Sequence, residues 1–339
     1  MRKIRVEDAV GTVLCHDITK VIPGQFKGRA FQRGHVILEE DIEEFKKIGK
    51  EHIYVWEEEA GEIHEDEAAL RIAHAVSGEN IIFTEPEEGK SLLKSTISGL
   101  FKVKHDLLLE LNSMDNITIP SLPNNYQVEK GQRLSGARIV PLVIKEEVIE
   151  ALEKRCAADG PVFEVRPYHA LKVGIIVTGN EVYLGRIEDK FGPIIETKLR
   201  HYNATVLGKT TCPDEMDTIC AAIQSYKEAG ADLIILTGGM SVDPDDLTPG
   251  AIKKTGAEIV TYGVPVQPGN MLMFAYLDGT ALLGVPGAAV YYRTTSLDLV
   301  LPRIFAGDIL TKRDFAQMGE GGFCQTCEKC TYPRCYVGR

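Results

Sequence analysis

The sequence lacks the features that mark several common classes of protein. No apolar run among its 339 residues reaches the ~18 residues that a membrane span requires. Its start, MRKIRVEDAVG, has basic side chains but no apolar segment of the kind found in secretory signals. The P-loop pattern GxxxxGK[ST], a GxGxxG after a strand and the Gly-x-Ser-x-Gly elbow do not occur. We therefore predict a soluble, cytoplasmic protein with no membrane partner, and the sequence supports neither P-loop chemistry nor an elbow serine.

Positive charge is also scarce, because 38 Lys and Arg residues stand against 49 Asp and Glu residues, a net charge of −11. Binding of duplex nucleic acid needs a clustered basic surface, so we expect no nucleic-acid partner. The negative net charge does not exclude a small anionic ligand, because backbone N–H groups can bind phosphate without net positive charge.

The eight cysteines are unevenly spread along the chain. Four are scattered, whereas the other four crowd into the last sixteen residues: Cys324, Cys327, Cys330 and Cys335. This asymmetry indicates reduced thiols with one local metal site, and it is unlike the disulfide framework of a secreted protein.

Composition and periodicity divide the chain into four segments. Residues 1–59 read as a β-rich segment with one helix that ends at Gly49. Residues 60–168 mix helical and strand patterns, with a helical or partly helical pattern over 90–103 and no chemical motif. An α/β domain is expected over 169–312, and a Cys-rich tail over 313–339.

Strands and helices alternate regularly from residue 169 onward. Strands are expected at 171–177, 204–212 and 231–239, a hairpin at 271–284, and one long helix at 288–307. Asp214 is placed to cap the helix that follows the second strand. This alternation predicts an α/β fold in which a three-layer, mainly parallel sheet is preceded by smaller mixed α+β and β-rich segments.

Four polar or Gly-containing loops follow strands of this sheet, at the edge where α/β proteins bind ligands. They lie at 178–189, 237–246, 265–269 and 284–287. Glycines let the backbone approach a bulky anion, and Thr237 and Ser241 add hydroxyl donors. Asp246 follows closely, and its carboxylate suits Mg²⁺ rather than phosphate itself. Each glycine taken alone is explained equally well by a tight turn.

These loops resemble those of the molybdopterin-binding domain shared by molybdopterin molybdenumtransferases and molybdopterin adenylyltransferases. The resemblance rests on TGNEV (178–182), GRIED (185–189), DLIILTGGMSVDPDD (232–246) and GVPGAAV (284–290), in that order. It covers about 40% of the chain. The N-terminal VEDAVGTVLCHDIT also looks like the start of a molybdenumtransferase.

The resemblance implies a site for molybdopterin or its adenylylated form. Catalytic roles fall on Asp246, Glu181 and Asp189. Cofactor-binding roles fall on Thr178, Gly179, Thr237, Gly238, Gly239, Ser241, Pro268, Gly269, Gly284, Pro286 and Gly287. The implied reaction inserts molybdate and releases AMP with help from Mg²⁺. A homodimer and a molybdoenzyme partner are further implications.

Several positions depart from the family pattern. Asn180 stands where the family has Asp, Asp243-Pro244 replaces a Gly, and the segment at 267–270 lacks a Lys. These changes weaken the case for turnover more than the case for binding. A non-catalytic molybdopterin carrier or sensor, whose tail docks to a partner enzyme, is therefore the alternative. A hydrolase acting on a pterin or flavin-like nucleotide is a third hypothesis.

The cysteine tail has the spacing C-x2-C-x2-C-x4-C. The two x2 intervals are typical of an iron–sulfur run, although the last interval differs from the bacterial ferredoxin motif. A [4Fe–4S] cluster, a structural Zn²⁺ and a metal-free flexible tail all remain open.

Overall fold

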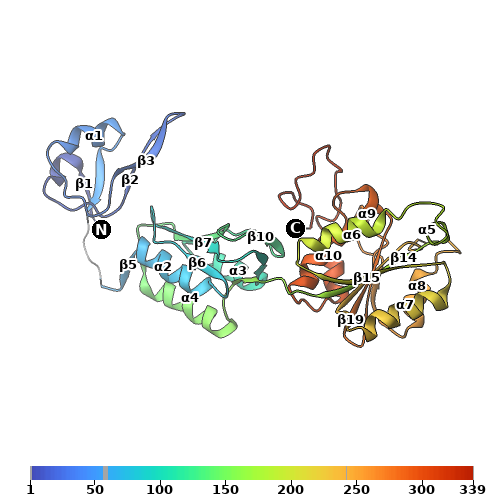
Figure 1. Cartoon of the computed structure of the whole chain (residues 1–339). Helices are drawn as coiled ribbons and strands as arrows, with labels where there is room; N and C mark the ends of the chain where they lie inside the picture. Colours follow the sequence, from blue (N-terminus) through green and yellow to red (C-terminus); the bar gives the residue numbers. More distant parts are fainter. Residues whose placement is uncertain (1, 56–59, 242, 339) are drawn as a thin grey trace. The chain divides into compact units, whose positions relative to one another are not determined.

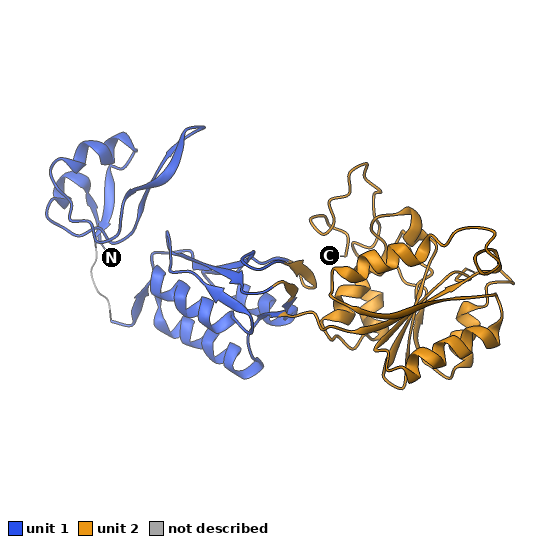
Figure 2. Ribbon diagram, viewed as in Figure 1, with its two compact units in different colours: residues 1–97, 102–122, 129–165 blue, residues 98–101, 123–128, 166–339 orange. Residues whose placement is uncertain are grey.

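The computed structural model describes residues 2–55, 60–241 and 243–338. The chain forms two compact units, which Figure 2 shows in blue and orange. Unit 1 contains Met1–Ile97, Lys102–Leu122 and Glu129–Val165, and unit 2 contains Ser98–Phe101, Pro123–Val128 and Arg166–Arg339. The finer division into four segments stays a prediction. Its boundary at 59 and position 242 of the second loop lie outside the described residues.

Unit 1 begins with short strands around a small apolar core that includes Leu14, Ile37 and Phe45. Gly49 follows helix α1 with a positive φ of 78°, which confirms the predicted helix end. The elements of this part are β1 (Arg2–Arg5), η1 (Val6–Ala9), β2 (Ile18–Ile22), β3 (Phe26–Phe31), α1 (Asp41–Lys47) and β4 (His52–Val55).

Residues 60–166, most of which belong to unit 1, combine helices with short antiparallel strands; β10 and most of β8 belong to unit 2. The four-stranded sheet of unit 1 has the order β6-β7-β11-β9. The elements of residues 60–166 are β5 (Glu62–His64), α2 (Glu65–Val76), β6 (Ile81–Phe83), β7 (Lys90–Ser95), β8 (Gly99–Val103), α3 (His105–Asn112), β9 (Ile117–Thr118), β10 (Tyr126–Val128), β11 (Arg133–Ile139), β12 (Val143–Lys145), α4 (Glu146–Asp159) and β13 (Phe163–Arg166).

The helical pattern predicted over 90–103 is wrong, because β7 and β8 are strands. Along β7 the buried positions alternate, and they are Ser91, Leu93 and Ser95. The buried serines bond locally, since the Ser91 hydroxyl donates to Thr84 O at 2.7 Å. Serines on the buried face hid the two-residue period that would have indicated a strand.

Unit 2 is built on a six-stranded sheet of order β15-β14-β16-β19-β18-β17. The first four strands of that order are mutually parallel. β18 is antiparallel to β19, and β17 is antiparallel to β18, so only β18 runs against the other five strands. This confirms the predicted mainly parallel α/β fold. The strands are β14 (Lys172–Thr178), β15 (Thr205–Cys212), β16 (Leu233–Thr237), β17 (Glu258–Tyr262), β18 (Met273–Leu277) and β19 (Thr280–Val285).

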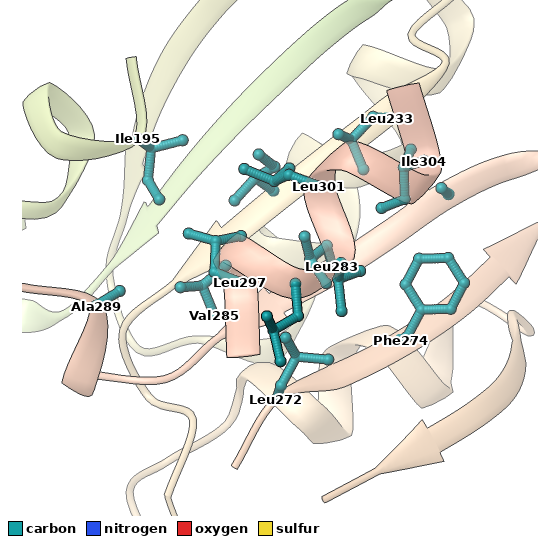
Figure 3. Packing of buried hydrophobic residues seen from close by; sticks show 14 of the residues in the cluster. Ile195, Leu233, Leu272, Phe274, Leu283, Val285, Ala289, Leu297, Leu301 and Ile304 are labelled. Atoms are coloured by element: carbon teal, nitrogen blue, oxygen red, sulfur yellow. The ribbon is translucent and has the colours of Figure 1, made fainter. Parts of the chain in front are cut away.

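Helices cover both faces of this sheet (Figure 1). Successive residues of a strand point to opposite faces, so Ile175 packs with α6 and α10, and Ile176 packs with α7 and α8. Figure 3 shows Leu297 and Leu301 of α10 beside Leu283 and Val285 of the sheet. The helices are α5 (Asn180–Tyr183), α6 (Phe191–Arg200), α7 (Met216–Glu228), α8 (Thr248–Lys254), α9 (Ala288–Tyr291), α10 (Ser296–Phe305) and α11 (Lys312–Gln317).

The long helix predicted over 288–307 is two helices, α9 and α10. Thr295 has an extended backbone and caps α10. The Asp298 carboxylate accepts a hydrogen bond from Thr295 N at 2.8 Å, which completes a capping box. The apolar pattern extends over both helices, so periodicity alone did not reveal the break. Among the described residues, no helix combines the length and the apolar character needed to span a bilayer.

The core of unit 2 predicts a large difference between two isoleucine truncations. Ile235 of β16 is fully buried, whereas Ile309 is 83% exposed. Ile235→Ala should lower the free energy of unfolding by about 2–5 kcal/mol, because it leaves a cavity between packed layers. Ile309→Ala should change it by about 0.5 kcal/mol or less. Scanning calorimetry of the full chain measures both, and equal shifts would contradict the described core.

Candidate functional site

The four predicted loops lie at one edge of the unit 2 sheet. The strand register aligns Thr178 with Cys212, Val177 with Thr237, and Thr237 with Val285. The parallel strands β15, β14, β16 and β19 therefore all end at this edge. Met273 pairs with Gly284, so the segment before β18, which contains residues 265–269, starts from the same edge. The sheet thus gathers all four loops, although they are spread over more than a hundred residues of sequence.

Three threonines form a buried group where β14 and β16 end. The Thr178 hydroxyl donates to Thr237 O at 3.3 Å and lies 3.0 Å from the Thr248 hydroxyl. Thr248, at the start of α8, also donates to Gly238 O at 2.9 Å. These contacts fasten the glycine loop to the neighbouring strand and to the next helix.

Gly238 allows the second loop to pass against the end of β14. Its φ is +87°, and a Cβ built on it would lie 2.1 Å from Thr178 O. No larger residue fits there without moving backbone atoms. Gly238→Val would therefore disturb the strand end itself, so it is a poor probe of ligand binding.

Thr237 has an unsatisfied hydroxyl. Its side chain is fully buried, and its Oγ1 has no hydrogen-bond partner among the described residues. Leaving a buried hydroxyl unpaired costs about 1–3 kcal/mol. Such an atom at the carboxyl end of a parallel strand marks a place where a ligand oxygen would be stabilised.

The second loop closes on itself through Asp246. The Asp246 Oδ2 accepts a hydrogen bond from Ser241 N at 2.9 Å, so one carboxylate oxygen shapes the loop. Tyr262 holds the loop from β17, since its hydroxyl donates to Met240 O and Ser241 O, each at 3.1 Å. Burial, with a contribution from the Asp246 charge, raises the pKa of Tyr262, so the phenol remains a donor at neutral pH.

The first loop places Glu181 and Asp189, its two predicted catalytic residues, differently. Asp189 Oδ1 accepts from Phe191 N and Gly192 N at 2.8 and 2.9 Å, and Asp189 Oδ2 lies 3.1 Å from Lys209 Nζ. Asp189 therefore stabilises the start of α6. Glu181 is exposed, and its carboxylate folds back over Gly179, where a Cβ would come within 3.0 Å of Oε1.

Asp214 does not cap α7, contrary to the prediction. Its Oδ2 accepts a hydrogen bond from Asn180 N at 2.9 Å, and Asp214 N donates to Asn180 Oδ1 at 3.3 Å. This reciprocal pair joins the end of β15 to the start of α5. It also places a carboxylate beside position 180, where the sequence has Asn in place of the family's Asp.

The third and fourth loops pack on neighbouring segments. Ser296 donates to Gly269 O at 2.6 Å, and Ser296 N donates to Pro268 O at 3.3 Å, so the third loop is fixed to α10. A Cβ on Gly284 would come within 2.5 Å of Met240 Cε, which brings the fourth loop against the second. Pro286 is buried, and Gly287 is exposed with open space where a Cβ would lie.

The four tail cysteines line one cavity of about 400 Å³, together with Tyr291, Tyr292 and Arg293. Arg293 thus borders the tail. Among the described residues, no three His, Cys, Asp or Glu side chains are gathered closely enough to hold a metal ion as they stand. The four cysteines therefore line the same cavity, but their sulfur atoms are not yet close enough together to coordinate one metal ion.

Comparison with known families bears on these loops directly. Residues 174–306 match the family model described as "Probable molybdopterin binding domain". This segment, which is less than half of the chain, is therefore similar to that family. It contains the first, second, third and fourth loops in full. Residues 3–57 match a second model, described as a domain of unknown function. Their likeness to the start of a molybdenumtransferase stays a prediction.

Proteins similar to this chain include two molybdopterin molybdenumtransferases. The one from Haemophilus influenzae is 28% identical over 214 residues, or 57% of this chain and 49% of the relative. The one from Synechococcus elongatus is 26% identical over 176 residues, or 49% and 44%. A CinA-like protein from Mycobacterium tuberculosis is 34% identical over 90 residues, or 26% and 21%. The chain thus spans about half the length of the molybdenumtransferases it matches.

Solved structures give a further comparison. The molybdopterin biosynthesis enzyme MoaB from Thermus thermophilus is 20% identical and has a TM-score of 0.32. The match covers 41% of this chain and 98% of that structure.

Sequence reasoning missed three residues that shape the site: Thr248, Asp214 in its contact with Asn180, and Tyr262. Thr248 stands in a Thr-Pro pair at the start of a helix, a pattern that indicates a helix end and nothing more. Tyr262 is the last residue of β17, the edge strand next to β18, and β17 ends at the same edge of the sheet. Only the strand order brings it to the second loop.

The threonine group predicts a stability effect for one hydroxyl. Thr248→Val should lower the free energy of unfolding by about 1–3 kcal/mol, because the carbonyl of Gly238 loses its buried donor. Thr205→Val, at an exposed position of edge strand β15, should change it by about 0.5 kcal/mol or less. Scanning calorimetry tests the pair, and matching melting temperatures would show that the Thr248 contact is not structural.

Proposed function

We propose that unit 2 binds molybdopterin, or its adenylylated form, with the phosphate at the second loop. The unpaired Thr237 hydroxyl carries this proposal, because a phosphate oxygen would supply the missing partner. The match of residues 174–306 to a family model described as a probable molybdopterin binding domain supports the choice of ligand. The other predicted binding residues lie at the same edge: Thr178, Gly179, Gly238, Gly239, Ser241, Pro268, Gly269, Gly284, Pro286 and Gly287.

Phosphate binding requires a small shift of the second loop. Thr237 Oγ1 is shielded from solvent in this structure, so the Gly238–Gly239 backbone must move before an anion reaches it. Both glycines have positive φ, and both lie against Thr178 and Thr248. Glycine at these positions permits such a change at low steric cost. The Ser241 hydroxyl is exposed and would add a second donor.

Asp246 fits a Mg²⁺ that is held mainly by the ligand's phosphate. Its Oδ2 is occupied by Ser241 N, and no described residue bonds to its Oδ1. Mg²⁺ typically keeps several waters and takes one or two carboxylates plus substrate phosphates, so one carboxylate oxygen is a fitting donor set. When bound, the ion would neutralise charge that develops on the departing phosphate. Ser241 N, which donates to Oδ2, keeps the carboxylate oriented.

The activity that we infer is a step of molybdenum cofactor biosynthesis. Molybdate would be inserted at the dithiolene of adenylylated molybdopterin. Water would cleave the phosphoanhydride, so that AMP leaves and the other phosphate stays on the pterin. The chain's part is to hold two anions together, by backbone N–H groups, by hydroxyls and by the orientation of Asp246. Glu181, which is exposed over Gly179, is placed to meet the ligand, whereas Asp189 would act through the position of α6.

A non-catalytic carrier or sensor is the second candidate function. The departures at 180, 243 and 267–270 favour it. The pairing of Asn180 with Asp214 uses the amide as a structural link. In this case the same loops would bind molybdopterin without cleaving the adenylylated form. A molybdoenzyme partner that docks to the tail belongs to this second function, whereas a homodimer and a tail metal are expected whichever of the two functions holds.

Removal of the unpaired Thr237 hydroxyl should affect protein stability and molybdopterin binding in opposite directions. Thr237→Val should leave the free energy of unfolding unchanged or raise it by about 1–3 kcal/mol, because a buried unpaired hydroxyl is removed. The same change should weaken molybdopterin binding by about 10-fold or more, since one bond to a charged oxygen is lost. Calorimetry and isothermal titration measure the two effects, with Thr205→Val as control. Unchanged affinity would remove Thr237 from the binding site.

Asp246 separates turnover from binding. Asp246→Asn keeps an oxygen that accepts from Ser241 N but loses the charge, so the loop should hold its shape. Molybdopterin affinity should stay near that of the wild type, whereas molybdate-dependent AMP release should fall by about 100-fold. Asp245→Asn, at an exposed neighbour, is the matched control. If the wild-type protein binds molybdopterin but releases no AMP, the carrier function is favoured. If the wild-type protein does not bind molybdopterin, both functions are contradicted.

A further inference from the structure

We infer that Cys324, Cys327, Cys330 and Cys335 form a thiolate-ligated metal centre, which closes when the metal gathers the cysteine loop around the cavity. The centre lies in unit 2, against α9 and the third loop. Its existence does not depend on the proposed function; only its influence on the pterin loops does.

The cysteine loop, residues 322–337, is already closed at its base. Gly338 N donates to Gly321 O at 3.1 Å, which joins the two ends of the loop. The Tyr336 hydroxyl donates to Phe323 O at 2.5 Å across the same base. Val337 is buried in the main core of unit 2. The loss of chain entropy on closing this loop therefore occurs when the domain folds, before any metal binds. This lowers the free-energy cost of bringing the four ligands together.

The loop is also fixed to the rest of the domain on two sides. Phe323 forms a parallel bridge with Gln267, in which Cys324 N donates to Gln267 O and Gln267 N donates to Gly322 O, each at 2.8 Å. The Tyr332 hydroxyl donates to Asp298 O of α10 at 3.0 Å. The tail is thus a built part of the domain, which argues against a free, flexible tail.

Two cysteines already have the polar neighbours that a thiolate ligand needs. Thr326 N donates to Cys324 Sγ at 3.4 Å. The Thr294 hydroxyl lies 3.2 Å from Cys330 Sγ. Donors of this kind stabilise the negative charge of a metal-bound thiolate and orient the ligand.

The ligand set is open as described, and the cysteines differ in exposure. Cys327 is exposed, whereas Cys324, Cys330 and Cys335 are half-buried. All four border the same cavity, so metal binding would have to draw their sulfur atoms together around that one space. Metal binding of this type is coupled to local ordering, because thiolate ligands seldom stand in their final positions without the metal.

An iron–sulfur cluster and a Zn²⁺ ion would both be coordinated by the same four thiolates. Two x2 intervals are typical of an iron–sulfur cluster, and four cysteines around one ion also suit a structural Zn²⁺. Both metals would cross-link the loop in the same way. Metal analysis therefore identifies the ion, while the structural role is common to both.

The centre would also influence the third loop. The bridge at Gln267 immediately precedes Pro268 and Gly269, two of the predicted molybdopterin-binding residues. The cavity wall at Tyr291, Tyr292 and Arg293 follows the fourth loop by a few residues. Ordering of the cysteine loop would restrict both segments at once. This coupling rests on the proposed function and is measured separately from metal content.

The test uses the full chain, purified anaerobically and reconstituted in parallel with iron plus sulfide and with Zn²⁺. The wild type should retain about one centre per chain. Iron with labile sulfide and broad visible absorption identifies a cluster, and zinc without such absorption identifies a structural ion. Cys327→Ser should lose the metal in either arm, because one of four ligands is removed. Cys220→Ser, at a half-buried cysteine outside the cavity, should retain it.

Melting temperature and hydrogen exchange complete the experiment. Metal loading should raise protection of the 322–337 amides and of Gln267 in the wild type, and it should not do so in Cys327→Ser. Because Cys327 is exposed, this variant is expected to fold, and calorimetry checks that it does. Substoichiometric iron and zinc after both reconstitutions, or full metal retention by Cys327→Ser, would overturn the centre. If the chain fails to bind molybdopterin but retains the metal, the metal centre is still supported and only the proposed function is contradicted.

Discussion

The site depends on the close approach of Gly238 to the end of β14. A Cβ at this position would lie 2.1 Å from Thr178 O, so the second loop reaches its place only because residue 238 has no side chain. That approach brings Thr178, Thr237 and Thr248 into one buried group, and it sets the direction in which the chain leaves the sheet. The Asp246 loop and its contact with Tyr262 follow from that direction.

Polar groups at this edge fall into two kinds. Most are satisfied within the protein: Asp189 stabilises α6, Asp214 pairs with Asn180, and Ser296 holds the third loop. Thr237 Oγ1 is not satisfied among the described residues. The satisfied groups build a rigid frame, and the unsatisfied one marks where a ligand would be bound with least competition from the protein. Residues that looked equivalent in the sequence therefore take different roles in the fold.

The tail extends this frame beyond the residues that match the family model. Its base is hydrogen-bonded between Gly321 and Gly338, and its first strand segment pairs with Gln267. Val337 contributes to the same core that holds α10 against the sheet. The Cys-rich segment is therefore continuous with the domain that carries the predicted ligand loops, and its chemistry can act on those loops through direct contacts.

The sequence by itself determined the mainly parallel sheet and the helix end at Gly49, because alternating apolar periods and turn residues are local signals. It also located the loops that match the family. It failed at β7, where buried serines replaced the apolar period, and at residues 292–295, where a cap divides an unbroken apolar pattern. Only the tertiary structure decided which acids stabilise helices, which hydroxyl is left unpaired and where the tail packs. Those outcomes depend on strand order and on close approach between distant segments, and neither is encoded in local spacing.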